Sequence, residues 1–258
     1  MSKRLLVLAG ITVAVSLMAV CGFVVRDSLP LFVDAYNPVV IRNSDDVRRQ
    51  NSILGPRRVS IRVDYLAITS AELATLLENT SVVDLDVTGC TLVDDKAFQS
   101  PGSSRELEVL RINGTSAGAD LSIICGAFQK LRRLEVRNCR IHVLDRKAAG
   151  SMRFLWSLEC GGAELNGAVI EGISAFPALQ RLSLNGARGL SSVELHPLSA
   201  CGALRELNLD RLTLDLKFLE KMCSKSALTW LSLLHASGVH EGEIRELQRK
   251  FPAITIQL

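Results

Sequence analysis

Aliphatic residues return at fixed places through most of the chain. The stretches Leu131 to Ile141 and Leu204 to Leu214 both follow L-x-x-L-x-L-x-x-(N/C/L)-x-L, where L is leucine, isoleucine or valine. Self-similarity of this kind decides the fold before any local signal does. The frame can be laid from nine starts that are 23 to 25 residues apart, namely Arg58, Val82, Leu107, Leu131, Leu155, Leu179, Leu204, Leu228 and Phe251.

Two positions of the frame are apolar in every unit. Because 48% of all residues are hydrophobic, eighteen apolar entries out of eighteen are not a chance result. The third position after each start holds Ile61, Leu85, Leu110, Leu134, Leu158, Leu182, Leu207, Leu231 and Ile254. The fifth holds Val63, Val87, Ile112, Val136, Cys160, Leu184, Leu209, Leu233 and Ile256.

Alternation over five residues predicts a short strand whose third and fifth side chains point inward and whose second, fourth and sixth point outward. The rest of each unit returns on the opposite side, and several returns predict helices. Apolar residues between Leu121 and Phe128 recur at i, i+3, i+4 and i+7, and Thr69 with Glu72 forms a capping pair before another apolar stripe. Helices are wider than strands, so the predicted array is curved, with strands concave and helices convex.

This pattern resembles the leucine-rich-repeat family over about 200 of the 258 residues. The resemblance implies an α/β solenoid of residues 58–258, with eight units of 24–25 residues and a closing half-repeat. The stretch from Glu241 to Ile256 is similar to the closing helix and half-repeat of bacterial and some mitochondrial members. The eighth position departs from the family, because cysteine, threonine, alanine and leucine replace the asparagine ladder, and glycines such as Gly89 and Gly114 precede it.

The first 57 residues follow another pattern. Leu5 to Val25 is a run of 21 residues without charge, which is long enough to cross a bilayer as a helix. Residues 1–26 therefore predict a single-pass anchor with a cytoplasmic N-terminus and an extracytoplasmic repeat domain. The alternative is a cleaved signal peptide, which would leave a secreted or periplasmic protein. Residues 27–57 are interpreted as a linker and an N-terminal cap.

Composition and motifs argue against catalysis, metal binding and nucleic-acid binding. The net charge is +3 and arginines alternate with carboxylates, so no basic stripe forms for nucleic acid. No C-x-x-C, H-E-x-x-H, G-x-S-x-G or glycine-rich phosphate loop occurs, and the four histidines are spread over three units without a fixed spacing to a cysteine or serine. We therefore expect no enzyme activity, no catalytic residues, no metal and no cofactor. Cys90, Cys139 and Cys160 occupy packing positions and are expected to be free, buried thiols.

The outward strand positions form the candidate binding surface. They are polar, and arginines from adjacent units gather in the middle between acidic residues. The predicted site consists of Arg111, Arg133, Glu135, Arg137, Glu159, Arg181 and Trp230. Arginine forks suit a carboxylate or phosphate on a partner, and tryptophan is enriched among interface anchors. The alternative is that the arginines pair with Asp84, Asp86, Glu135 and Glu159 across neighbouring strands.

The leading hypothesis is a non-enzymatic protein-interaction or scaffolding module, held at a membrane through Leu5 to Val25, whose protein partner binds the concave sheet. A second hypothesis is a mitochondrial inner-membrane assembly factor for respiratory complexes, although the N-terminus lacks an arginine- and serine-rich transit peptide. A third is a substrate adaptor of a ubiquitin ligase, whose repeats often carry cysteine at the eighth position, as Cys90 and Cys139 do.

Overall fold

The computed structural model describes residues 38–42, 45–46, 58–63, 68–225 and 227–258. The chain divides into two units, Met1–Asn37 and Pro38–Leu258, and the first lies wholly outside the described residues. The predicted anchor from Leu5 to Val25 belongs to that first unit and stays a prediction. Within the described ranges, no helix is both long and apolar enough to span a bilayer.

Strands of the described part form one parallel sheet of ten strands, in which each strand pairs with the next strand along the chain. This order is what a solenoid requires, because each unit adds one strand beside the previous one. The strands are β1 (Val39–Ile41), β2 (Val59–Val63), β3 (Val82–Asp86), β4 (Val109–Arg111), β5 (Arg133–Glu135), β6 (Ser157–Glu159), β7 (Arg181–Ser183), β8 (Glu206–Asn208), β9 (Trp230–Ser232) and β10 (Thr255–Gln257).

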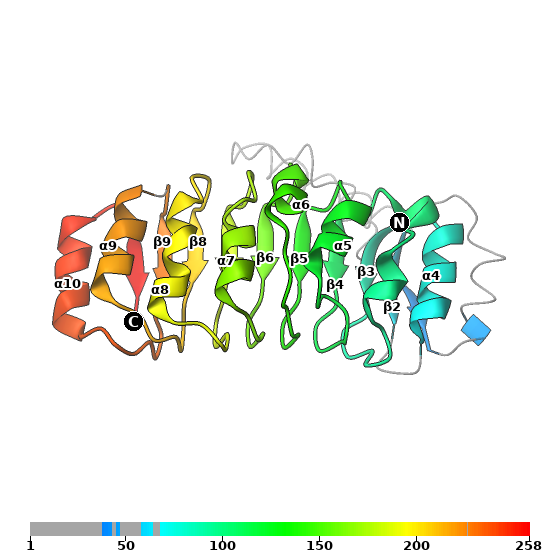
Figure 1. Ribbon diagram of the computed structural model, residues 1–258, viewed down its shortest axis with the longest axis horizontal. Coiled ribbons are helices and arrows are strands. Elements are labelled where there is room, and N and C mark those ends of the chain that lie inside the picture. The colour runs from blue at the N-terminus through cyan, green and yellow to red at the C-terminus, as the bar shows by residue number, and fades with distance from the viewer. Residues whose placement is uncertain (1–37, 43–44, 47–57, 64–67, 226) are drawn as a thin grey trace, which may run out of the picture. The chain divides into compact units, whose positions relative to one another are not determined.

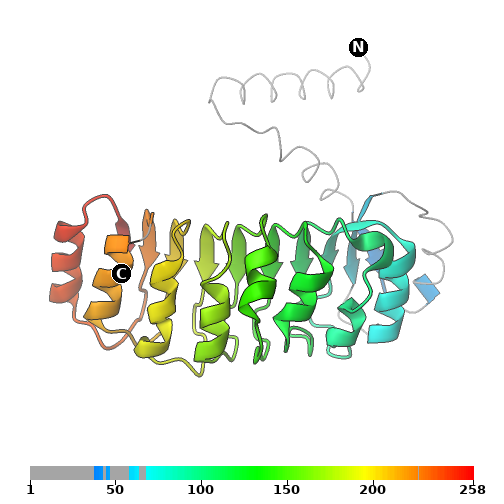
Figure 2. The same cartoon turned by 45° about the horizontal axis from the view of Figure 1, so that its top comes forward.

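Helices cover one side of this sheet and leave its other side open, as Figures 1 and 2 show. The described α-helices are α4 (Ser70–Asn79), α5 (Leu121–Ala127), α6 (Arg146–Ser151), α7 (Gly167–Ile173), α8 (Ser192–Leu195), α9 (Leu216–Lys225) and α10 (Glu241–Lys250). Short 3₁₀ turns accompany them: η1 (Asp95–Phe98), η2 (Gly102–Ser104) and η3 (His196–Ala200). The predicted helices after Thr69 and from Leu121 are confirmed.

The core lies between the sheet and the helices. All eighteen residues that the sequence predicts to point inward are buried. From β3 to β9 the third-position residues pair in register, as in Leu134 with Leu158 and Leu158 with Leu182. Each fully buried leucine or isoleucine contributes on the order of 1.5–3 kcal/mol, so these two columns carry much of the stability.

Two parts of the predicted frame are corrected by the strand register. Ile256 pairs with Leu231, so the last unit starts at residue 253, two residues later than predicted from Phe251. Ile256 therefore holds the third position and Leu258 the fifth. The shift was invisible in sequence because Ile254 and Ile256 alternate with the same period of two. The sheet also starts earlier than the frame, since β1 pairs with β2.

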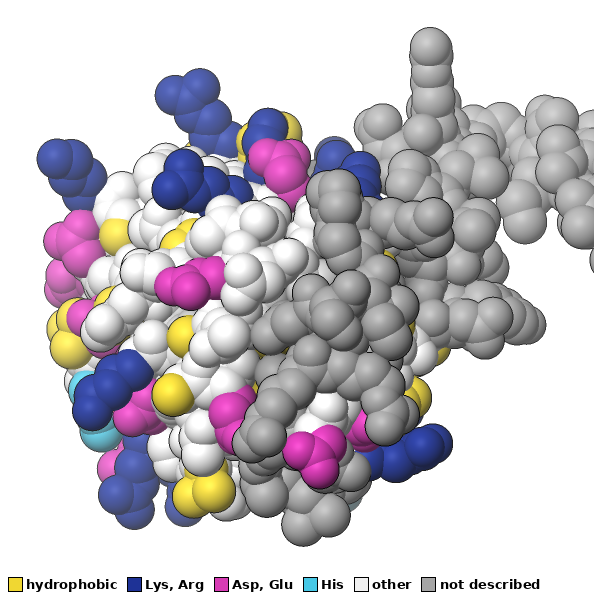
Figure 3. Space-filling model, turned by 90° about the vertical axis from the view of Figure 1, so that its right-hand side faces the viewer, with side chains coloured by type: hydrophobic (Ala, Val, Ile, Leu, Met, Phe, Trp, Pro, Cys, Tyr) yellow, Lys and Arg dark blue, Asp and Glu magenta, His cyan; other side chains and the backbone are white. Residues whose placement is uncertain are grey.

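The end of the solenoid that carries β1 and α4 is viewed in Figure 3. Where described atoms are visible there, hydrophobic side chains are scattered among charged ones. Residue Ile41 of β1 is buried, and α4 buries three leucines of its apolar stripe. The Thr69 and Glu72 side chains close a reciprocal capping box at the start of α4, as the sequence predicts.

Each described turn after β3 to β9 passes through one residue in the left-handed backbone region. This residue always holds the seventh position of its unit, and its φ lies between 56° and 78°. Glycine adopts this conformation at no steric cost, whereas other residues are strained by about 1 kcal/mol. The column reads Gly89, Gly114, Asn138, Gly162, Gly186, Arg211 and His235.

The described α-helices from α4 to α10 start after a polar residue at the border of the sheet where the strands end, and so does η1. Aspartate, asparagine, serine or threonine accepts backbone N–H groups that the first turn leaves unpaired. The capping residues include Thr69, Asp94, Asp120, Asp145, Asn166, Ser191, Asp215 and His240. This border therefore gathers polar caps, and helix C-termini lie at the opposite border.

The cysteines Cys90, Cys125, Cys139, Cys160, Cys201 and Cys223 are free and buried in the described part of the chain. The prediction of free, buried thiols is thus confirmed for the three that it named. Burial raises the pKa of the Cys125 thiol to about 12 and that of Cys201 to about 11. The Cys139 thiol donates a hydrogen bond to the carbonyl oxygen of Ile112 at 3.2 Å.

A matched pair of glycine substitutions tests the left-handed turn column. A Cβ at Gly114 or at Gly126 would meet no atom within 4 Å, so neither substitution creates a clash. Gly114 has a φ of 65°, whereas Gly126 lies inside α5. We expect Gly114→Ala to lower the free energy of unfolding by about 1 kcal/mol and Gly126→Ala to raise it by about 0.5–1 kcal/mol. Urea unfolding measures both; equal effects would contradict the role of the turn.

Because the buried thiols have raised pKa values, we expect the free energy of unfolding to fall at alkaline pH. An unfolded thiol ionises near pH 8.5, but the buried thiols keep their protons to about pH 11 or 12. The unfolded state then binds fewer protons than the folded state, so the free energy of unfolding falls as pH rises through this window. Each thiol adds up to about 1.4 kcal/mol per pH unit to the slope. Cys125→Ala should reduce the slope of the free energy of unfolding against pH, measured by urea unfolding between pH 8.5 and 11. An unchanged slope would contradict the contribution of the buried thiol.

Candidate binding surface on the outer sheet face

The outer sheet face is the side of the sheet that the helices leave open, formed by the second, fourth and sixth positions of each unit. Its side chains are mostly polar, as predicted, and some are covered by their neighbours. Glu135, Ser157, Asp210 and Ser232 are buried although they belong to this face. Two regions differ in how their polar groups are used, one over β3–β6 and the other over β6–β9.

Over β3–β6, arginines and carboxylates form one continuous ion-pair network. Glu135 lies at its centre, with its side chain 7% exposed. Its carboxylate is 3.3 Å from Arg111 Nε and 2.9 Å from an Arg133 terminal nitrogen. Arg111 also binds Asp84 at 2.7 Å, and Arg133 approaches Glu159 at 3.4 Å. The interpretation of cross-strand pairing is therefore correct for Asp84, Glu135 and Glu159.

Two pKa values follow from this network. The hydrogen bond from Arg137 to Glu159 raises the pKa of the Arg137 guanidinium above its usual range. Burial raises the pKa of the Asp84 carboxyl, and the nearby Arg111 opposes that effect. Asp84 is held by Arg111 and Glu159 by Arg137, so part of the hydrogen-bonding capacity of these groups is already used within the sheet.

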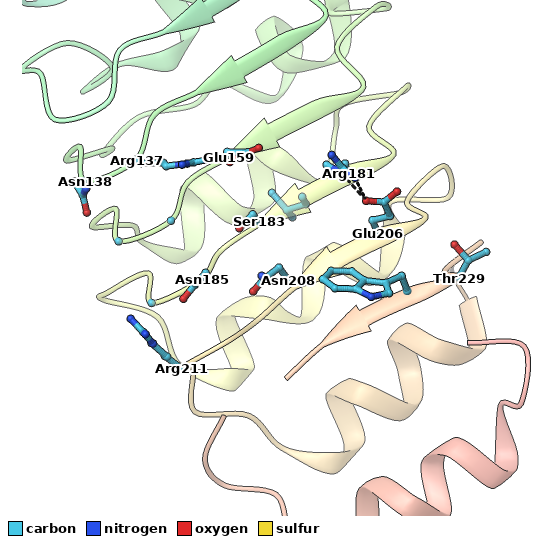
Figure 4. A pocket seen from close by; sticks show the side chains of 15 residues that line it. Arg137, Asn138, Glu159, Arg181, Ser183, Asn185, Glu206, Asn208, Arg211 and Thr229 are labelled. Carbon is cyan, nitrogen blue, oxygen red and sulfur yellow. Dashed lines mark hydrogen bonds and ion pairs between the residues drawn. The ribbon is translucent and has the colours of Figure 1, made fainter. Parts of the chain in front are cut away.

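Over β6–β9, the outer sheet face forms an open pocket with a volume of about 850 Å³. Figure 4 shows Arg137 and Glu159 at one side and the Arg181–Glu206 pair at another, with Ser183, Asn185 and Asn208 between them. Arg181 Nε donates to Glu206 at 2.5 Å. Trp230 also lines the pocket and is partly buried. Three arginines and two glutamates give this pocket a small positive charge.

The asparagines of the outer sheet face distinguish the two regions. Asn113 accepts the backbone N–H of Arg137 at 2.8 Å and donates to Thr88 and Glu135. Asn185 holds the same sixth position in β7's unit, but its side-chain amide has no hydrogen-bond partner among the described residues. Asn208 accepts one backbone N–H at 2.9 Å, and its NH₂ group is unpaired within the same ranges. Asparagine can make up to four such bonds, so the pocket holds unused donors and acceptors.

Arg211 supplies a further unpaired group. It is exposed, it lies in the strained left-handed turn after β8, and its guanidinium has no ion-pair partner in the described part of the chain. Its neighbour Asp210 anchors this turn by accepting hydrogen bonds from Ser232 Oγ at 2.6 Å and from the Leu234 N–H at 2.8 Å. The next strand thus fixes the backbone that presents Arg211 to the pocket.

Away from this pocket, a hydroxyl, an imidazole and a carboxylate lie close together. Ser192 bonds to Asp215, and His196 Nε2 lies 3.9 Å from the same carboxylate. Asp215 accepts the Phe218 N–H at 2.7 Å and so caps α9, which lowers its pKa. A nucleophile would need its hydroxyl on the imidazole rather than on the carboxylate. This arrangement is accounted for as a helix cap.

The predicted site residues divide between the two regions. Arg137, Glu159, Arg181 and Trp230 line the pocket, whereas Arg111, Arg133 and Glu135 belong to the network beside it. Sequence reasoning missed Arg211, Asn185 and Asn208 as members of one site. Arg211 falls at a seventh position that holds glycine in four other units, and that departure was the available signal.

Comparison with known proteins supports the fold. The sequence matches no protein-family model, and no curated protein matches it. The structure is similar to internalin C2 from Listeria monocytogenes, with a TM-score of 0.51 and 17% identity over 76% of this chain and 77% of that one. A leucine-rich-repeat protein of Leptospira interrogans has a TM-score of 0.47 and 13% identity, over 83% of this chain and 57% of that one.

A second internalin of Listeria monocytogenes has a TM-score of 0.38 and 12% identity, over 77% of this chain and 72% of that one. The similarity to internalin C2, together with the ten-stranded parallel sheet of the described residues and its helices, confirms the predicted leucine-rich-repeat fold.

The central carboxylate of the network gives a stability prediction. Glu135→Gln keeps the shape of the side chain but removes the charge that faces Arg111 and Arg133. We expect the free energy of unfolding to fall by about 1–2 kcal/mol, because the pairs are largely but not fully shielded from water. Glu164→Gln is the control, since Glu164 pairs with the highly exposed Arg140 and should change stability little. Equal losses in urea unfolding would mean that the network is not structural.

Proposed function

We propose that this leucine-rich-repeat solenoid is a non-enzymatic protein-interaction module whose partner binds the pocket on the outer sheet face over β6–β9. The observation that carries the proposal is the difference between the two regions of that face. Over β3–β6 the charged groups bind one another, while over β6–β9 Asn185, Asn208 and Arg211 retain hydrogen-bonding capacity.

The pocket favours a partner segment that combines a carboxylate with an apolar side chain. Arg211 offers a planar fork of donors that suits a carboxylate, and Trp230 offers a partly buried aromatic surface. The asparagine amides between them suit backbone N–H and C=O groups of the bound segment. In this proposal the network around Glu135 holds the neighbouring strands in place and does not itself bind.

We also propose that the module is held at a membrane by Leu5 to Val25, with the repeats on the extracytoplasmic side. The support is the uncharged run of 21 residues and its flanking charges. Roles in the assembly of respiratory complexes or as a ubiquitin-ligase adaptor depend on residues 1–57, most of which lie outside the described ranges. Those two hypotheses therefore stay predictions.

Capture from detergent-solubilised membranes of the source cells tests the binding site. Full-length protein carrying Arg211→Ala and Trp230→Ala should lose its partner, with affinity falling about tenfold or more, because interface energy concentrates on few residues. Both side chains point away from the core, so the melting temperature should change little. Quantitative mass spectrometry of the captured proteins identifies the partner by its loss from this variant.

Arg140→Ala with Arg188→Ala is the matched control, because both arginines are exposed at the border where the strands end. This control variant should capture the same protein as the unaltered chain does. Undiminished capture by the Arg211 and Trp230 variant would refute the pocket as the binding site. If the partner is lost only from a variant that carries Arg111→Ala and Arg133→Ala, it binds over β3–β6 instead.

A further inference from the structure

Two aromatic side chains are exposed in one turn at the border where the strands begin. Phe154 is 45% exposed and Trp156 is 39% exposed, and they flank the buried Leu155. At the position of Trp156 in the neighbouring units, the chain holds Arg132 and Gln180, both polar. Nothing in the packing of the solenoid accounts for large aromatic surfaces at this place.

Basic side chains surround these aromatics. Lys130 Nζ lies 5.2 Å from the centre of the Phe154 ring, and Arg153 precedes Phe154 in the chain. Lys130, Arg153 and Arg205 are exposed and form no ion pair with any acidic residue of the described ranges. We name Lys130, Arg132, Arg153, Phe154, Trp156 and Arg205 the basic-aromatic cluster.

Backbone hydrogen bonds place this cluster along one line. The Trp156 N–H donates to the Arg132 carbonyl at 3.0 Å, and the Gln180 N–H donates to the Trp156 carbonyl at 2.9 Å. The Arg205 N–H continues the row by donating to Gln180 at 2.8 Å. Consecutive strands are about 4.8 Å apart, so the side chains project side by side from one border of the sheet. This border lies along the top of the solenoid in Figure 1.

Helix ends explain part of this charge but not the aromatics. Helix C-termini meet this border, and basic residues near them are favoured by the helix dipole, as Lys130 after α5 and Arg153 after α6 illustrate. That effect gives no reason to expose Phe154 or Trp156 between the cations. Aromatic rings beside lysine and arginine are the combination that favours the interface of a bilayer with anionic headgroups.

We propose that the basic-aromatic cluster binds the surface of an anionic lipid bilayer, with Phe154 and Trp156 at the level of the headgroups. This proposal rests on the proposed membrane anchor, which would keep the repeats close to the bilayer. Residues 26–37 lie between the predicted anchor and Pro38 and span at most about 40 Å when extended. An anchored solenoid is therefore kept within reach of the bilayer, and the cluster fixes which border faces it.

Tryptophan fluorescence tests the proposal in the full-length chain, since Trp156 and Trp230 are the two tryptophans of the sequence. The Trp230→Phe variant, reconstituted into vesicles, reports on Trp156 alone. Phospholipids with brominated acyl chains should quench Trp156 in vesicles that contain phosphatidylglycerol, and much less in vesicles of pure phosphatidylcholine. The Trp156→Phe variant, which reports on Trp230 of the outer sheet face, should not be quenched.

Charge variants complete the test. Lys130→Gln with Arg153→Gln in the Trp230→Phe chain should weaken the association about fivefold for each cation removed, and so abolish most of the quenching. Arg146→Gln with Lys147→Gln removes the same charge from exposed positions of α6 and should leave the quenching unchanged. Thermal unfolding followed by circular dichroism verifies that each variant is folded.

The two membrane proposals fail separately. Release of the chain from vesicles by carbonate overturns the anchor, whereas quenching of Trp156 by anionic vesicles still supports the cluster. A chain that resists carbonate but shows no anionic-dependent quenching overturns the cluster. A change in Trp156 fluorescence on adding single-stranded RNA or an acidic peptide, with no change on adding anionic vesicles, also overturns the lipid proposal. It would assign this border of the sheet to that partner instead.

Discussion

Every element of this solenoid depends on the aliphatic side chains that each strand sends inward at two fixed positions. A strand of three residues with one helix cannot bury these side chains alone, so each unit is stable through its neighbours. The columns that begin with Ile61 and Val63 therefore set the period, the parallel order and the register of the sheet. Side chains between them must then point outward, which creates the face that is open to partners.

The same constraint separates the two borders of the sheet. Because all crossovers run in one direction, helices start where strands end, and polar caps such as Asp120, Asp145 and Ser191 gather at that border. Helix C-termini meet the other border, where lysine and arginine are favoured. The outer sheet face and the basic-aromatic cluster are thus two surfaces of different chemistry, and one protein can offer both at once.

Periodicity predicted the fold and the buried columns, since both depend on spacing, whereas the closing helix α10 was expected from the family resemblance. It placed the last strand two residues too early, because Ile254 and Ile256 fit either register. It also missed β1, whose three residues carry too little pattern to distinguish a strand from a linker. Left-handed backbone at Asn138, Arg211 and His235 was not predicted, although glycine holds the same position in four other units.

The candidate site was predicted less well, for a physical reason. Sequence columns identify which side chains face outward, but pairing depends on side-chain geometry across neighbouring strands. Arg111 and Arg133 face outward as expected and are held by Asp84, Glu135 and Glu159. Arg211, which the columns did not select, is the arginine that the pocket leaves unpaired among the described residues.

Site-specific photo-crosslinking tests the central claim most directly, because Asn113 and Asn185 hold the same outward position in different units. A photoreactive side chain at residue 185 lies in the pocket, whereas one at residue 113 lies over the ion-pair network. If the pocket binds the partner, illumination in source-cell membranes yields a covalent product from residue 185 and little from residue 113. Crosslinking from residue 113 alone, or equally from both, would contradict the assignment of binding to β6–β9.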